Sequence, residues 1–365
     1  MIEDPHIGGR ELIYKVLTTR PGWNHPPPKG VASARERYPD YIEVKQPAEP
    51  LPFPPRFELM PQLQSRFPQE PVIIPEHFIA RLPNARVFSY HGVVIDEQDD
   101  VMTDLTFEFG RFAKGSRVCH YEALPPVEEI DGRVLVLPSV SSWKNYFHWM
   151  SESVPRMRTI SPDDYDFAVA PEGRPYHRNS LDLMGIPKEK RIAAKENTHI
   201  RARELIVPNP THPGVTHREG VEYIRRLVDR PPLAETKPGK RRIYVGRGDA
   251  WKRKILNETE VVAALEPLGI EQVFLDGLTI PEQAELFADL ELVVSPHGAA
   301  LTNLMFSAPG TKVVECFPDQ FVQAHFFRLA GSCGFEYFGH WTADDPSQWH
   351  FDLHVESLVK LTESV

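Results

Sequence analysis

The chain has 365 residues, enough for two or three domains, because a single hydrophobic core rarely grows beyond about 250–300 residues. The formal net charge of −10 argues against a nucleic-acid partner, whose phosphates require a basic surface. Three widely spaced cysteines without zinc or redox spacing, and the lack of a signal peptide or a membrane-length apolar run, favour a cytoplasmic location.

Residues 1–85 are expected to form a proline-rich N-terminal arm. Nearly half of the 36 prolines lie in this stretch, including Pro26-Pro27-Pro28 and Pro54-Pro55. Proline has no N–H group to donate and disfavours helix interiors, so an extended or irregular chain is predicted. Aromatic side chains such as Trp23 and Phe53 indicate that the arm packs on the body of the protein.

Residues 86–230 alternate between strand and helix patterns. Continuous apolar runs such as 134–137 are typical of buried strands, whereas residues 145–152 and 218–228 have helical patterns. This alternation favours a parallel sheet with crossover helices. We therefore predict a first α/β domain, Rossmann-like, over residues 86–230.

A second alternation follows a linker at residues 231–240, where two prolines and a Pro-Gly pair separate a helix from a strand. Residues 241–340 are predicted to form a second Rossmann-like domain, and residues 341–365 a C-terminal helical tail. The strands of this second domain are expected at 242–245, 273–275, 292–295 and 312–317. Ligands of such domains bind at the carboxyl ends of the strands, and two facing domains create a cleft.

The most informative motif is Ser295-Pro-His297-Gly298-Ala299-Ala300-Leu-Thr302-Asn303, which follows a strand and opens an apolar helical segment. Gly298, Ala299 and Ala300 leave the backbone accessible, and the unpaired N–H groups of a helix start favour a phosphate. His297 and the Ser, Thr and Asn side chains add hydrogen-bonding groups. A tight strand-to-helix turn without a ligand is the alternative interpretation.

A basic loop follows the strand at 242–245. Gly246-Arg247-Gly248 matches the start of a dinucleotide fingerprint, but Trp251 stands where a third glycine is needed, which disfavours NAD binding. The remaining cations favour binding of a nucleotide diphosphate, with a solvated charge run as the alternative. They are Arg247, Lys252, Arg253 and Lys254.

Carboxylates supply the other candidate chemistry. His148 and Glu152 lie four residues apart, so they would share one helix face and supply a general base, or form a pair that satisfies only itself. Glu315, near the end of a buried strand, is expected to bond ribose hydroxyls or to form a structural salt bridge. Asp164 and Asp166 match a short pattern of metal-bound sugar nucleotides, but we interpret them as a polar strand entry and predict no metal site.

Three segments of the chain occur in the order seen in one known family. They are Asn145-Tyr-Phe-His148-Trp149-x-x-Glu152-x-x-Pro155-Arg156, then Tyr244-x-x-Arg247 with Arg253 and Asn257-Glu258, then Ser295–Asn303 followed by Val314-Glu315. Together they resemble glycosyltransferase family 61, which includes plant xylosyl- and arabinosyltransferases and many bacterial members. The resemblance spans residues 86–340, with Gly-Arg-Gly at 246–248 in place of the more usual Ser-Arg.

The resemblance implies a GT-B architecture, with two Rossmann-like domains facing across a cleft and the second one holding the nucleotide sugar. It also implies inversion at the sugar carbon, with neither an obligatory metal nor a cofactor. Arg247 and Arg253 would hold the diphosphate, and Glu315 would lie near the nucleoside. The residues that would cradle phosphate and sugar are Ser295, His297, Gly298, Ala299, Ala300, Thr302 and Asn303.

The resemblance also implies an acceptor side. His148 and Glu152 would face the acceptor, and either of them could be the base. Asn145, Trp149 and Arg156 would contribute to acceptor binding.

We therefore expect an inverting, metal-independent, bacterial-type glycosyltransferase that moves a sugar from a UDP-sugar to a hydroxyl of a glycan or glycolipid, in surface polysaccharide or lipopolysaccharide synthesis. A non-catalytic nucleotide-sugar or glycan-binding protein with the same fold is the alternative, whereas Trp251 disfavours an epimerase or dehydrogenase. The sequence leaves open the donor sugar, the acceptor, homo-oligomerisation and peripheral contact with a membrane.

Overall fold

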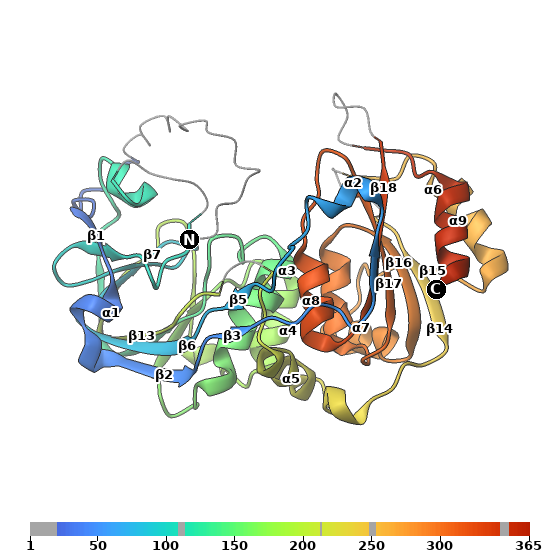
Figure 1. Ribbon diagram of the computed structural model, residues 1–365. Helices are drawn as coiled ribbons and strands as arrows, with labels where there is room; N and C mark the ends of the chain where they lie inside the picture. The colour runs from blue at the N-terminus through green and yellow to red at the C-terminus, as the bar shows by residue number, and fades with distance from the viewer. Residues whose placement is uncertain (1–19, 109–113, 212–213, 248–252, 344–349) are drawn as a thin grey trace. The chain divides into compact units, whose positions relative to one another are not determined.

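The computed structural model describes residues 20–108, 114–211, 214–247, 253–343 and 350–365. These residues form a mixed α/β protein with parallel strands (Figure 1), which confirms the predicted fold class at that level. The described residues divide into two compact units. Unit 1 takes its residues from 1–47 and 76–212, and unit 2 from 48–75 and 213–365.

This division differs from the expected boundaries. The proline-rich segment is shared, because its described residues up to Pro47 belong to unit 1 whereas residues 48–75 belong to unit 2. Helix α5 (Arg218–Leu227), expected in the first domain, belongs to unit 2. The buried Arg225 explains this placement, because its guanidinium donates to the carbonyl oxygens of Met305 (3.0 Å) and Ser307 (2.8 Å).

Unit 1 is built on a ten-stranded mixed sheet with the order β1-β9-β8-β7-β13-β10-β11-β12, in which β6 also pairs with β13 and β2 with β6. Strands β10 to β13 are parallel, whereas β6 and β7 run antiparallel to β13. The strand bounds are β1 Gly30–Ala32, β2 Ile42–Gln46, β6 His77–Pro83, β7 Arg86–Phe88, β8 Val93–Ile95, β9 Asp100–Met102, β10 Glu128–Val136, β11 Phe167–Ala170, β12 Arg191–Ala193 and β13 His199–Pro208.

Strands β7 and β8 form an antiparallel hairpin. Ser89 (φ 59°) and Gly92 (φ 68°) adopt the left-handed conformation and reverse the chain. A Cβ atom on Gly92 would lie 2.4 Å from the carbonyl oxygen of Pro138, so only glycine fits there. Short helices complete the unit: α1 Ala34–Arg37, α3 Tyr146–His148 and α4 Pro175–Leu183, with 3-10 or π turns at Pro39–Tyr41, Arg117–His120, Trp149–Thr159 and Lys188–Lys190.

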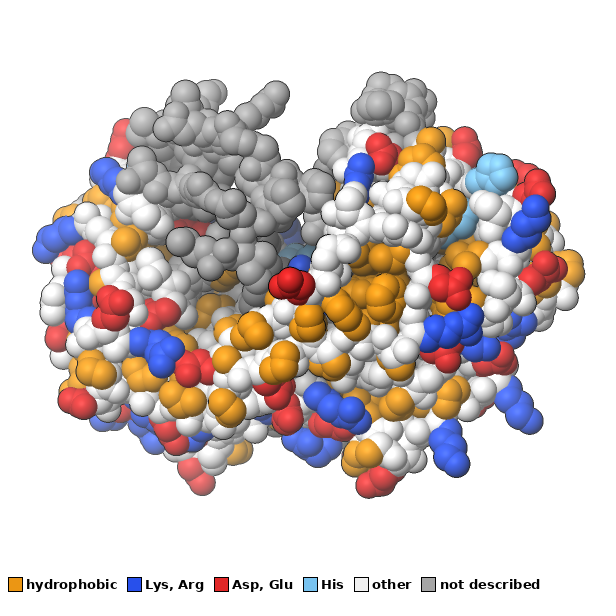
Figure 2. All heavy atoms as spheres, in the orientation of Figure 1, with side chains coloured by type: hydrophobic (Ala, Val, Ile, Leu, Met, Phe, Trp, Pro, Cys, Tyr) orange, Lys and Arg blue, Asp and Glu red, His pale blue; other side chains and the backbone are white. Residues whose placement is uncertain are grey.

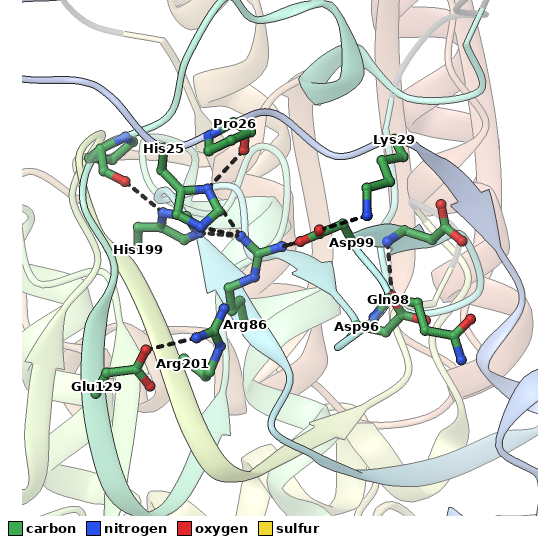
Figure 3. Close-up of polar contacts among 12 residues, drawn as sticks. His25, Pro26, Lys29, Arg86, Asp96, Gln98, Asp99, Glu129, His199 and Arg201 are labelled. Atoms are coloured by element: carbon green, nitrogen blue, oxygen red, sulfur yellow. Dashed lines mark hydrogen bonds and ion pairs between the residues drawn. The ribbon is translucent and has the colours of Figure 1, made fainter.

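A buried arginine fastens the N-terminal segment to the unit 1 sheet (Figure 3). The Nη1 atom of Arg86 lies 3.3 Å from Nε2 of both His25 and His199, and Nη2 bonds Asp99. Each imidazole directs Nδ1 at a backbone carbonyl, which leaves each Nε2 to accept from the guanidinium. Burial, followed by the Arg86 charge, lowers the pKa of His199 to about 4.

Unit 2 is built on a six-stranded sheet with the order β15-β14-β16-β17-β18-β4, and all its pairings are parallel. The strands are β4 Phe57–Leu59, β14 Arg241–Val245, β15 Glu271–Val273, β16 Leu290–Pro296, β17 Lys312–Pro318 and β18 Glu336–Thr342. Strand β4 comes from the proline-rich segment, for which an extended or irregular chain was predicted. The N-terminal segment therefore completes the edge of the second sheet.

The alternation of side chains in unit 2 divides its core between two faces of the sheet. Val314 and Cys316 join a cluster with helices α6 (Glu258–Leu265) and α9 (Val355–Ser364). Phe317 and Tyr337 point to the other face, where Phe327 of α8 (His325–Cys333) packs edge-on against Tyr337. The remaining elements are α2 Pro61–Gln64, α7 Ile280–Ala288, the 3-10 helix η8 Ala299–Phe306, 3-10 turns at Leu233–Glu235 and Glu266–Leu268, and the small hairpin of β3 Glu49–Pro50 with β5 Ile73–Ile74.

Basic and acidic side chains are interspersed over both units on the face shown in Figure 2. The charge pattern of that face is therefore mixed rather than dominated by one sign.

Within the described ranges, the helices are too short or too polar to cross a bilayer.

Candidate functional site

The strand order of unit 2 identifies where a ligand would bind. Strand β14 is followed along the chain by β15 on one side and by β16 on the other, so the order reverses between β14 and β16. In open parallel sheets, ligands bind outside the carboxyl ends of the strands at such a switch point. Val245 and Pro296 end these two strands, so Arg247 and the loop from His297 onward lie at this point.

Arg247 and Gly298 are in direct contact there. The Nη1 atom of Arg247 donates to the carbonyl oxygen of His297 at 2.9 Å, and a Cβ atom on residue 298 would lie 2.1 Å from that nitrogen. The backbone of Gly298 is extended (φ −177°), so glycine is needed for space rather than for conformation. Burial lowers the pKa of the Arg247 guanidinium.

Arg253 brings a second guanidinium to the same place. Its backbone is left-handed (φ 58°), which is uncommon for a residue with a side chain and is often found at functional sites. The guanidinium carbon lies 4.1 Å from the ring centroid of Phe321. Burial and the Arg247 charge lower the pKa of Arg253 to about 10. Two partly desolvated like charges favour an anion between them.

His297 completes this group and is held from behind by Glu315. Nδ1 of His297 lies 2.5 Å from Oε1 of Glu315, and the hydroxyl of Tyr337 donates to Oε2 of the same carboxyl group. The side chains of His297 and Glu315 are 6% and 0% exposed. Burial raises the pKa of Glu315 well above its usual value, and burial with the charges of Arg253 and Arg247 lowers the pKa of His297 well below its own.

Glu315 therefore contacts a protein side chain rather than lying open to a ribose. Register explains the contact, because Ser295 pairs with Glu315 across β16 and β17, and His297 follows two residues later. The structure thus gives Glu315 a buried side-chain partner, as the alternative of a structural role predicted. Tyr337 was not predicted from the sequence, since only the pairing of β17 with β18 brings it to the carboxyl group.

The other polar residues of the loop hold its shape. Ser295 Oγ donates to the carbonyl oxygen of Val245 (2.8 Å), which ties the end of β16 to the end of β14. Asn303 Nδ2 donates to Gln283 Oε1 on α7 (2.7 Å), and Thr302 is buried in η8. Ser295 and Asn303 thus tie the loop to neighbouring elements, and contact of the three side chains with a ligand stays a prediction. Among the described residues, the buried hydroxyl of Thr302 has no hydrogen-bond partner. Ala299 and Ala300, half-buried at the start of η8, keep the position the sequence predicted.

Part of the basic loop lies outside the described residues, namely Gly248, Trp251 and Lys252. Phe321, 36% exposed, was not predicted from the sequence, because only the fold brings its ring to Arg253. It packs at 5.4 Å from the His297 ring as well as against Arg253. The described group at the switch point therefore consists of Arg247, Arg253, His297, Gly298 and Phe321.

Unit 1 carries the second candidate group on the helical segment 146–159. Asn145 caps this segment, because its side chain accepts from the N–H of Phe147. His148 Nδ1 lies 2.5 Å from Glu152 Oε1, so the predicted i, i+4 contact is confirmed. The two side chains are 13% and 3% exposed, which makes His148 the accessible partner. Ser139 Oγ lies 3.5 Å from the other oxygen of Glu152.

Trp149 and Arg156 are structural, which corrects the expectation that they bind an acceptor. Trp149 is fully buried and its Nε1–H donates to Ser180 Oγ at 2.7 Å. Arg156 is buried as well and donates to the carbonyl oxygens of Leu137, Pro138 and Pro208. Its charge needs these acceptors because it is removed from water. Asn145 is likewise engaged as the helix cap.

Potential metal ligands were considered separately. Asp164 pairs with Arg81 (2.8 Å) and Asp166 with Arg133 (2.9 Å), as a polar strand entry would. Within the described residues, Glu49, His217 and Glu219 bring ligand-type atoms within 4.8 Å of one another. Both ring nitrogens of His217 already lie near an oxygen, at 3.2 Å from Glu49 and 3.0 Å from the carbonyl of Pro75. Hydrogen bonding alone accounts for that arrangement.

Comparison with known proteins yields two findings. Residues 146–314 match the family model described as Glycosyltransferase 61. The chain is also 28% identical over 198 residues to the β-1,2-xylosyltransferase XAX1 of Oryza sativa subsp. japonica. The alignment covers 52% of this chain and 31% of the rice protein, so the chain spans about a third of that relative's length. The matched region begins at the His148–Glu152 segment and ends beside Glu315.

Proposed function

We propose, from the premise that this chain belongs to glycosyltransferase family 61, that it moves a sugar from a nucleotide-sugar donor to a hydroxyl group of a glycan acceptor. The observation that carries the donor assignment is the cluster at the switch point of unit 2. Arg247 and Arg253 offer two guanidinium groups, and His297 lies beside both. Guanidinium groups match the geometry of phosphate oxygens with paired donors.

The proposal places the leaving diphosphate on these side chains and on the start of η8. Breaking the bond between the sugar and the diphosphate develops negative charge on the departing oxygens. The two arginines can stabilise this charge, and the first N–H groups of η8 (Ala299–Phe306) add partial positive charge. We propose UDP as the nucleotide and a reaction that does not depend on a metal ion, since the arginines supply the charge.

The proposal assigns the base to His148, which decides between the two candidates from the sequence. Glu152 accepts from Nδ1–H of His148, which leaves Nε2 as the nitrogen that takes a proton. The 13% exposure of His148 against 3% for Glu152 supports the same assignment. Glu152 then orients the ring and stabilises the imidazolium that forms.

The reaction follows as a single displacement with inversion at the sugar carbon. His148 takes the proton of the acceptor hydroxyl, the hydroxyl oxygen forms the new bond to the sugar carbon, and the diphosphate leaves with the electron pair. We propose a GT-B arrangement for it, with donor binding in unit 2 and acceptor chemistry in unit 1. A glycan or glycolipid of a surface polysaccharide is the proposed acceptor.

Calorimetry followed by a transfer assay tests this proposal. UDP should bind the unmodified protein, and a panel of UDP-sugars should give transfer or slow donor hydrolysis that excess chelator leaves unchanged. Binding without transfer or hydrolysis under any acceptor would instead favour a non-catalytic sugar-nucleotide-binding protein. Loss of activity in chelator, restored by Mn²⁺, would contradict metal independence.

A further inference from the structure

The carboxyl group of Glu315 is enclosed by partners that leave little place for a negative charge. It is 0% exposed, and its two oxygens face Nδ1 of His297 and the hydroxyl of Tyr337. Tyr337 is a neutral donor, because burial and then the Glu315 charge raise the pKa of its hydroxyl. An ionised buried carboxylate needs a paired cation or several hydrogen bonds to offset its lost hydration.

Three arrangements of protons are compatible with the 2.5 Å contact between Oε1 and Nδ1. A carboxylate facing a neutral ring leaves one buried negative charge. A carboxylate facing an imidazolium buries two charges, one of them beside Arg247 and Arg253. A carboxylic acid donating to Nδ1 buries no charge and satisfies both oxygens, because Oε2 still accepts from Tyr337.

The surroundings of His297 favour the third arrangement. Its ring is stacked on Phe317 at 5.5 Å and lies 5.5 Å from Phe326, so one side is apolar. The charged neighbours, Arg247 and Arg253, both disfavour a positive ring. His325, at 6.1 Å, is the other titratable ring nearby. Burial raises the pKa of Glu315 more than the Tyr337 hydrogen bond and the Arg253 charge lower it, and burial lowers the pKa of His297, which agrees with a neutral pair.

We propose that Glu315 is a positioning residue that acts as a carboxylic acid: it donates its proton to Nδ1 of His297 and thereby holds the ring proton on Nε2. The ring then presents a neutral N–H donor beside the two arginines. This ligand assignment rests on the proposed function: the N–H donor would meet a phosphate oxygen of the nucleoside diphosphate. The site would then recognise the diphosphate with two charged groups and one neutral one, and no step would change the charge of His297.

The protonation state is tested first without any ligand. Nitrogen-15 NMR of the histidine side chains in the unmodified protein should show His297 as the tautomer protonated at Nε2 at neutral pH. A ring protonated only at Nδ1, or at both nitrogens, would overturn the proposal. A His297→Gln variant serves only to assign the resonances.

Matched substitutions test the role of the carboxyl group in binding. Glu315→Gln can donate its amide N–H to Nδ1 and accept from Tyr337, so UDP affinity should stay within about threefold of the unmodified protein. Glu315→Leu offers no donor, so affinity should fall by about tenfold, the loss expected for one hydrogen bond to a charged group. An equal loss in both variants would overturn the proposal, because it would show that a negative charge is required.

A pH series separates positioning from general damage to the fold. In Glu315→Leu the ring regains an Nε2–H group when it becomes an imidazolium. Because burial and the charges of Arg253 and Arg247 hold the pKa of His297 well below its usual value, the affinity deficit should shrink only below about pH 6. A merely structural defect would leave the deficit constant, which would count against the proposal. If the unmodified protein bound no nucleoside diphosphate, the proposed function would lose its donor site, whereas the NMR measurement would still judge Glu315.

Discussion

Two histidine–glutamate pairs with the same contact geometry occur in different settings in this protein. In both, Nδ1 of the imidazole lies 2.5 Å from Oε1 of the glutamate. His148 and Glu152 sit one turn apart on a helical segment of unit 1, whereas His297 and Glu315 come from neighbouring strand ends of unit 2. The pairs differ in their neighbours, and the neighbours decide the chemistry.

The carboxyl groups show this difference most clearly. Arg156 is the cation near Glu152. The charge of Glu152 raises the pKa of the Arg156 guanidinium, although burial lowers that pKa by more. Glu315 accepts from the hydroxyl of Tyr337, and its pKa is raised by burial more than the Tyr337 hydrogen bond and the Arg253 charge lower it. We therefore expect Glu152 to orient a base in unit 1, and Glu315, as a carboxylic acid, to orient a donor in unit 2.

The largest expected effect follows from breaking the unit 1 pair. His148→Ala should lower kcat by about 10²–10⁴-fold, the usual contribution of a general base, while UDP affinity stays unchanged. Glu152→Gln should lower kcat less, because it leaves the base in place but weakens its orientation. Rates with a fixed acceptor and calorimetry with UDP measure the two quantities. Full activity in His148→Ala would show that the base lies elsewhere.

A third histidine sharpens the comparison, because the ring of His199 contacts the guanidinium of Arg86 rather than a glutamate. Its pKa is lowered to about 4 by burial, so the unfolded chain takes up a proton first as the pH falls. The free energy of unfolding should therefore fall between about pH 6.5 and about pH 4, by ~3 kcal/mol from this residue. His199→Gln should reduce that fall in denaturant titrations across this range. An unchanged pH dependence would contradict the neutral assignment.

Arg253→Ala tests the cations that distinguish unit 2. It should weaken UDP binding by about 10- to 100-fold, because one charge-assisted contact is lost and the Phe321 ring loses its partner. The matched control is Arg226→Ala, which removes a basic side chain from the last turn of α5. This variant should bind UDP as the unmodified protein does. Equal binding by Arg253→Ala and the unmodified protein would remove the diphosphate assignment.

The smallest effect is expected from Gly298→Ala. The added Cβ would approach Arg247 Nη1 to 2.1 Å, so the flexible guanidinium must move while the extended backbone stays unstrained. UDP affinity should fall by about 3- to 10-fold with little change in thermal stability. Gly173→Ala is the matched control, because its added Cβ atom would meet nothing within 4 Å. Gly185→Ala is unsuitable, because the φ of Gly185 is positive and an alanine there would be strained. A large loss of stability would indicate a packing role for Gly298 instead.

Several features of the site could be predicted from the sequence because they are local. The strand, glycine and helical turn at 292–303 follow from residues next to one another, with η8 running from Ala299 to Phe306. His148 and Glu152 meet because helical periodicity places i and i+4 on one face. Pro155 marks where the helical segment tightens into a 3-10 turn, as proline in a helix suggests.

Other features depend on contacts between distant parts of the chain. Trp149 and Arg156 matched a binding motif, yet their burial depends on how the helical segment packs against α4 and on the carbonyls after β10 and in β13. The proline-rich segment was expected as one arm, but its share in two sheets depends on which edges remain unpaired. Local composition carries no record of either outcome.

The sequence by itself determined the kind of fold, the glycine-containing loop after β16 and the histidine–glutamate pair of unit 1, since each arises from residues within a few positions of one another. Only the tertiary structure decided that Glu315 holds His297, that Tyr337 closes the pair, and that Arg247 packs on Gly298. Those contacts depend on strand order and register, which long-range packing sets. The same packing removes water from the carboxyl group of Glu315 and so raises its pKa.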